Sequence, residues 1–163
     1  MLVKLFAFFD QLIILVRGDY LLMTKYNKLI VIIGLVISTL VGLWHFFVPY
    51  LYQWYSYIQE APRAIIVSVD WINFLFSLLL SGNSIILIFF RKKLFKGDNI
   101  LLTYYGFLVG VWFCRIVITI IHPWNYDFML LGQLVAFIII FALMVYPFSI
   151  LIKDKIKQSK IMK

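Results

Sequence analysis

The chain has 163 residues, of which 64% are hydrophobic and only 13% are charged, and its mean hydropathy is +1.01. Because an ordinary soluble domain carries about 25% charged residues, this composition excludes a water-soluble fold. The net charge of +8 does not indicate a nucleic-acid-binding protein, since the basic residues gather at the ends of apolar segments as topology signals and lipid-phosphate contacts. A single cysteine, Cys114, excludes a disulfide framework.

The first 26 residues contain an apolar stretch that is too short to cross a membrane. Residues 5–16 are apolar but are interrupted by Asp10 and Gln11, and a secretory signal would have a cleaner apolar core and a small-residue cleavage site. Polar and apolar side chains fall on different faces of a helical wheel. The segment 1–26 is therefore predicted to be an amphipathic helix that lies in the cytoplasmic interface.

Four later segments are long enough to cross a bilayer, since a hydrocarbon core of about 30 Å needs about 20 helical residues. Each is bounded by charged residues, Pro or Asn, which are helix-start and turn signals. The segments are residues 29–52, 64–90, 100–121 and 128–152. The sequence predicts an all-α membrane protein: a four-transmembrane-helix bundle within residues 27–153, followed by a basic cytoplasmic tail at 154–163.

The distribution of basic residues predicts the orientation of this bundle. Thirteen of the 15 Lys and Arg residues lie in the N-terminal flank, the connection 91–99 and the C-terminal tail, while the other two connections hold only Arg63. The positive-inside rule then predicts a multi-pass cell-membrane protein with both termini in the cytoplasm. Aromatic residues in the other connections predict a belt at the opposite surface: Trp54, Tyr55, Tyr57, Trp124 and Tyr126.

One polar side chain from every span falls at a similar depth, roughly 8 to 11 Å below the outer boundary at 1.5 Å per residue. Because neighbouring spans run in opposite directions, sequence spacing alone does not produce this agreement. Asn73 lies one helical turn beyond one of these residues. The pattern predicts an outward-facing pocket inside the membrane, with these candidate ligand-binding residues: His45, Asp70, Asn73, Arg115 and Gln133.

The charges within this layer suggest a specific pairing. Arg115 stays protonated and needs an anion in low dielectric, and Asp70 is the only carboxylate within the spans, so the sequence predicts an ion pair between them. His45 titrates near neutral pH and is a candidate proton carrier. A structural alternative is that these groups only fix helix register. One His and one Asp are too few ligands for a specific metal centre, so no metal ligands are assigned.

Small residues and prolines also carry structural information. Pro49 and Pro147 are expected to bend or end the first and fourth helices locally. Small residues that recur every four positions let helices approach closely, which predicts tight-packing faces on the first and third spans. These residues are Gly34, Ser38 and Gly42 on the first span and Gly106 and Gly110 on the third.

The stretch Gly42-Leu-Trp-His-Phe-Phe-Val-Pro49, a connection that ends in Ala61-Pro62 and the span that follows resemble the start of the DoxX-like group of small four-helix membrane proteins. The resemblance implies a four-helix bundle, an acidic residue in the second helix at the place of Asp70, and an association with quinone-linked or oxidoreductase complexes. The sterol-binding EXPERA-domain family shares the layout without a shared motif.

Together these features predict a protein that binds a lipid-like or quinone-like ligand in the intramembrane pocket, in a redox-linked role. The alternative is a non-catalytic accessory or structural subunit of a larger membrane complex. The expected partners are membrane lipids and other membrane-protein subunits or further copies of the chain, with no nucleic acid. Soluble-type hydrolase, kinase and zinc-protease motifs are absent, and the sequence does not decide whether the protein is an enzyme.

Overall fold

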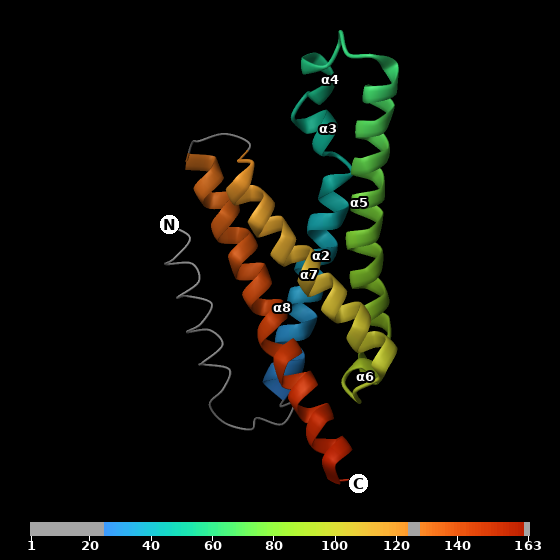
Figure 1. The fold of residues 1–163 in the computed structure, drawn as a ribbon, viewed down its shortest axis with the longest axis vertical. Coiled ribbons are helices and arrows are strands. Elements are labelled where there is room, and N and C mark those ends of the chain that lie inside the picture. Colours follow the sequence, from blue (N-terminus) through green and yellow to red (C-terminus); the bar gives the residue numbers. More distant parts are fainter. Residues whose placement is uncertain (1–24, 124–127, 162–163) are drawn as a thin grey trace.

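The computed structural model describes residues 25–123 and 128–161, so the predicted amphipathic helix lies outside the described residues apart from its last two positions. Four long helices form the described fold (Figure 1). They are α2 (Lys25–His45), α5 (Arg63–Phe89), α7 (Asn99–Ile121) and α8 (Phe128–Ile161). All four are long and apolar enough to cross a membrane, and no strand occurs in the described ranges. The predicted all-α, multi-pass bundle is confirmed.

Three one-turn helices lie at the two ends of the bundle: α3 (Val48–Leu51), α4 (Trp54–Tyr57) and α6 (Arg91–Leu94). Figure 1 shows α3 and α4 beside the first turns of α5, and α6 between α5 and α7 at the opposite end. We call these two ends the α3/α4 end and the α6 end. The single helix predicted over residues 29–52 was wrong, because α2 stops at His45.

The prolines explain where the first helix stops and where the fourth does not. Pro49 lies in the first turn of α3, where its missing N–H leaves no helical bond unmade, so a new helix begins there after a break. Pro147 instead lies inside α8, which continues through it to Ile161. The prediction that a proline bends or ends the helix is confirmed for the end of α2, whereas α8 does not end at Pro147.

Small residues let α2 and α5 pack with their backbones almost in contact. An ideal Cβ on Gly42 would lie 2.6 Å from the backbone nitrogen of Ser81, so no side chain fits between the two helices at this point. One helical turn away, the hydroxyls of Ser38 and Ser84 are hydrogen-bonded at 2.9 Å. This interface confirms the tight-packing face predicted on the first span.

The same face of α2 also contacts α8, and α7 packs on α8 in a similar way. A Cβ on Gly34 would lie 2.9 Å from Met144 Sδ, and one on Gly106 would lie 2.9 Å from the Phe148 ring. The Tyr105 hydroxyl donates a hydrogen bond of 3.0 Å to the Met144 carbonyl oxygen. The second predicted small residue of α7, Gly110, has no atom within 4 Å of such a Cβ, so the predicted packing face of α7 is confirmed only at Gly106.

The two tightly packed pairs, α2 with α5 and α7 with α8, diverge toward the α3/α4 end (Figure 1). They meet through a core in which Tyr105, Trp112 and Met144 are almost completely buried. At the α6 end, Leu94 is buried while the neighbouring basic side chains of α6 are exposed. The Lys155 Nζ donates a hydrogen bond of 3.2 Å to the Gly97 carbonyl oxygen and joins α8 to the α6 connection. The α6 end is therefore tied together by contacts between α8 and the connection that precedes α7.

Gly42→Ala should destabilise the fold by about 1 to 3 kcal/mol, because the new methyl group would overlap the α5 backbone and force the helices apart. Gly110→Ala is the matched control, since its methyl group meets open space and alanine favours the helix by about 0.5 to 1 kcal/mol. Thermal unfolding in detergent measures both. Equal Tm values for the two variants would contradict the close α2–α5 packing.

Candidate functional site

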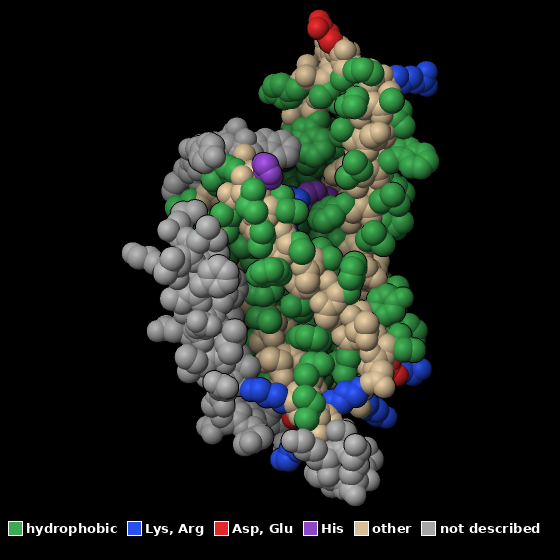
Figure 2. All heavy atoms as spheres, viewed as in Figure 1, with side chains coloured by type: hydrophobic (Ala, Val, Ile, Leu, Met, Phe, Trp, Pro, Cys, Tyr) green, Lys and Arg blue, Asp and Glu red, His purple; other side chains and the backbone are tan. Residues whose placement is uncertain are grey.

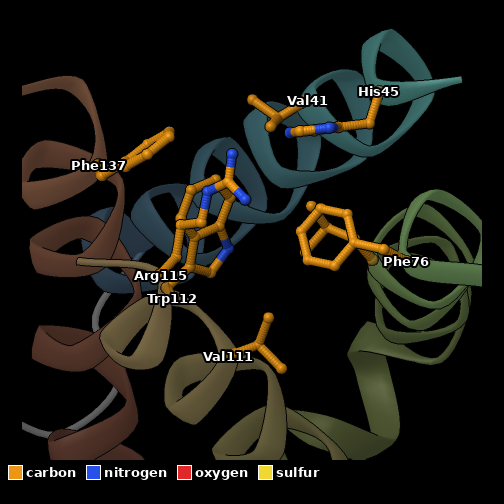
Figure 3. A pocket seen from close by; sticks show the side chains of 8 residues that line it. Val41, His45, Phe76, Val111, Trp112, Arg115 and Phe137 are labelled. Atoms are coloured by element: carbon orange, nitrogen blue, oxygen red, sulfur yellow. The ribbon is translucent and has the colours of Figure 1, made fainter. Parts of the chain in front are cut away.

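A pocket lies between the two helix pairs, toward the α3/α4 end. All four long helices contribute to its wall (Figure 3). In the space-filling view, basic and His side-chain atoms lie recessed between apolar side chains at this level (Figure 2). Its interior has room for about one water molecule. Its lining is formed by Val41, His45, Phe76, Leu80, Val111, Trp112, Arg115 and Phe137.

Arg115 on α7 is the only Lys or Arg in this lining. Its guanidinium carbon lies 5.6 Å from the centre of the Phe76 ring on α5 and 5.1 Å from that of Phe137 on α8, which are cation–π distances. Among the described residues, no carboxylate forms an ion pair with Arg115, and no acceptor receives a hydrogen bond from its side chain. The guanidinium is therefore held by aromatic rings, and its N–H groups have no acceptor within residues 25–123 and 128–161.

His45 is the last residue of α2, and its ring faces the same pocket as Arg115 (Figure 3). The ring stands edge-on to Phe76 with 5.0 Å between centroids, which limits its rotation. Asn73 Nδ2 on α5 donates a hydrogen bond of 2.8 Å to the His45 carbonyl oxygen. This bond gives a donor to one of the carbonyls that have no partner within a helix at its C-terminus. It also fixes the position of His45 along the axis of α5.

Asp70 makes a different contact from the one predicted. Its Oδ1 accepts a hydrogen bond of 2.6 Å from the Tyr55 hydroxyl of α4, and no ion pair joins it to Arg115 in the described part of the chain. The prediction of an Asp70–Arg115 pair was wrong. After the break at His45 the chain continues as α3 and α4 beside the first turns of α5 (Figure 1), which places the Tyr55 hydroxyl against the Asp70 carboxylate.

Gln133 also lies away from the pocket lining. It is half-buried on α8, one turn before Phe137, but does not line the pocket. Of the five predicted residues, the structure brings His45 and Arg115 together, places Asn73 behind His45, and leaves Asp70 and Gln133 outside. Within the described ranges, no three His, Cys, Asp or Glu side chains lie close enough to hold a metal ion.

The apolar wall of the pocket was missed by the sequence analysis. Phe76 follows Asn73 by three residues, and Phe137 follows Gln133 by four. Residues three or four positions apart lie on the same face of a helix, so these two aromatic residues could have been predicted as part of the pocket wall. Trp112 also lines the pocket. Its Nε1 donates a hydrogen bond of 3.1 Å to Ser38 Oγ, so this N–H group already has an acceptor within the bundle.

No protein-family model matches the chain, and comparisons with curated proteins and with solved structures also find no match. The resemblance to the DoxX-like group stays a prediction.

Tyr55→Phe should lower stability by about 1 kcal/mol, because it removes a short hydrogen bond to a partly exposed carboxylate that ties α4 to α5. Asp70→Asn should have a similar effect, and the double variant should lose little more than either single variant. Tyr57→Phe is the control, since this phenol is 83% exposed. Thermal unfolding of the four variants provides the comparison, and fully additive losses would exclude the contact.

The same contact predicts a high-pH transition. The hydrogen bond to Asp70, helped by burial, raises the pKa of Tyr55 to about 12. Because this pKa is raised above the unfolded value of about 10, the stabilisation is complete below pH 10 and is lost as the pH rises through about 12. Ultraviolet titration of tyrosinate should show a transition near pH 12 that disappears in Tyr55→Phe and moves toward 10 in Asp70→Asn.

Proposed function

We propose that the protein binds an anionic amphiphile in the pocket around Arg115, from the outer half of the membrane. The observation that carries the proposal is a half-buried guanidinium inside a membrane-spanning helix, with no acidic partner among the described residues. An anionic group of a bound molecule would form an ion pair with this guanidinium.

The energetics favour such a ligand. An arginine inside a span is costly, by up to about 2.5 to 3.5 kcal/mol at the helix centre on insertion scales. Each cation–π contact returns about 1 to 2 kcal/mol when desolvated, but the rings of Phe76 and Phe137 accept no strong hydrogen bonds from the guanidinium edge. An anion would engage those donors, and charge-assisted hydrogen bonds are about twice as strong as neutral ones. Arg115 is thus held in place for an anion that comes from outside the bundle.

The apolar surroundings favour an amphiphile over a free inorganic ion. Most pocket residues are apolar, and the large side chains on the outside of α5 and α7, including Phe74 and Phe113, are exposed toward the region where lipid chains would lie. An ion with a hydrocarbon chain can keep the chain in that region while its headgroup meets Arg115. A quinone would offer only neutral carbonyls, so a charged headgroup compensates the guanidinium better.

We also propose that both termini lie in the cytoplasm, which places the pocket toward the outer leaflet of the cell membrane. The support is the positive-inside pattern: α6 with its exposed Arg91, Lys92 and Lys93 and the basic C-terminal tail share one end of the bundle. In the chain from the end of α2 to the first residue of α5, at the α3/α4 end, Arg63 is the only Lys or Arg residue.

Cysteine labelling tests this orientation. The native Cys114 is replaced by Ala, and single cysteines are introduced at Glu60 and Lys96, which lie at opposite ends of the bundle. In intact cells, a membrane-impermeant maleimide should label the Glu60 position and should label the Lys96 position only after permeabilisation. The reverse pattern would place the pocket in the inner half of the membrane and overturn the proposed orientation.

Native mass spectrometry of the full chain, purified in mild detergent, tests the proposed ligand. The wild-type protein should retain an anionic amphiphile, and Arg115→Gln should lower its occupancy by about tenfold or more because the charge-assisted bonds are lost. Arg63→Gln is the control, since Arg63 is exposed and outside the pocket.

Equal occupancy in the Arg115→Gln and Arg63→Gln variants would contradict the proposal. If Arg115→Met were as stable as wild type and no adduct were retained by either protein, Arg115 would have only a packing role. The accessory-subunit alternative would then be preferred.

A further inference from the structure

We infer that the anion bound by Arg115 is a monocarboxylate on a single hydrocarbon chain, that is, an acid of the fatty-acid type. This inference rests on the proposed function and specifies its ligand class. It follows from the number of donors in the pocket, the charge around it and the space within it.

The described donors match a carboxylate. In the pocket lining, only His45, Trp112 and Arg115 carry polar side-chain atoms, and the Trp112 N–H is bonded to Ser38. The planar guanidinium offers two parallel N–H groups, which fit the two oxygens of one carboxylate. An imidazole N–H of His45 can add one further bond. A phosphate monoester brings three terminal oxygens and a charge near −2, which exceed what these groups can satisfy.

The local charge also favours a singly charged headgroup. Arg115 is the only Lys or Arg among the residues that line the pocket, so it can neutralise one negative charge. The helix end that reaches the pocket is the C-terminal end of α2, at His45. That end carries the partial negative charge of the helix dipole, which opposes an anion of higher charge.

The space in the pocket selects a small headgroup. It has room for about one water molecule, so a flat three-atom carboxylate requires less movement of the wall than a tetrahedral phosphate. Val41, Val111 and Phe137 line the pocket with apolar surface on three different helices. This surface suits the first methylene groups of one chain, whereas the glycerol backbone of a phospholipid would bring two ester groups against it.

The test uses the full chain in nanodiscs of zwitterionic phosphatidylcholine. Binding of tritiated oleate is measured at a pH where the carboxylate is ionised, with competition by oleoyl lysophosphatidate and by oleyl alcohol. Oleate should bind, the phosphate should compete at least about tenfold more weakly, and the alcohol should not compete. Arg115→Gln should weaken oleate binding by about tenfold or more, while Arg63→Gln should leave it unchanged.

A conservative variant keeps the test informative if Arg115→Gln does not fold. Arg115→Lys keeps the positive charge but loses the two-pronged geometry, so it should weaken oleate binding several-fold and shift the preference toward the phosphate. An unchanged preference in a folded Arg115→Lys protein would contradict recognition by the guanidinium fork. The Tm of each variant confirms that it is folded.

The remaining outcomes separate this inference from the proposed function. If lysophosphatidate binds more tightly than oleate, and its binding depends on Arg115, the monocarboxylate is wrong and the anionic amphiphile stands. If no probe binds in an Arg115-dependent manner, both are wrong. If oleyl alcohol competes as well as oleate, the headgroup charge is irrelevant and both fail.

Discussion

The close approach of α2 to α5 is the constraint on which the rest of the fold depends. Gly42 leaves no space for a side chain against the backbone of Ser81, and the Ser38–Ser84 hydrogen bond lies on the same face. Asn73 then ties the last carbonyl of α2 to α5. These contacts fix the register of the two helices and so the position of His45 along α5, while the hydrogen bond from Trp112 to Ser38 joins α2 to α7, the helix of Arg115. The hydrophobic effect does not drive helices together within lipid, so close backbone packing and hydrogen bonds must determine which helix faces associate.

The serines of α5 show how polar residues are accommodated in this interface. Ser77 and Ser81 donate hydrogen bonds of 2.6 and 2.7 Å to the carbonyl oxygens of Asn73 and Ser77, one turn earlier in the same helix. Their protons are therefore satisfied without a partner from another helix. The small side chains can then serve as close-packing surface between α2 and α5.

The fold could be predicted from the sequence because it follows from segment length, hydropathy and small-residue spacing. The pocket was predictable only in part. Helical periodicity and depth identified His45 and Arg115, since both positions depend only on local helix geometry. The partner of Asp70 depended on how the chain turns after α2, where Gln53 adopts a left-handed φ of 51° between α3 and α4. Sequence spacing contains no signal for that turn, so charge alone pointed to Arg115 as the partner of Asp70, whereas the partner is Tyr55.

Pro147 creates a point in α8 at which the helix can bend. The proline lacks an N–H, so the carbonyl of Leu143 loses its usual helical donor, and that carbonyl faces Gly34 of α2. Bending of α8 is concentrated at such a point. Phe137 lies ten residues away, which is roughly 15 Å along the helix. A bend of about 10° at the proline would move this ring by roughly 2.5 Å over that lever arm. Such a bend would shift the pocket wall formed by α8 by nearly the diameter of a water molecule without changing the contacts between α2 and α5.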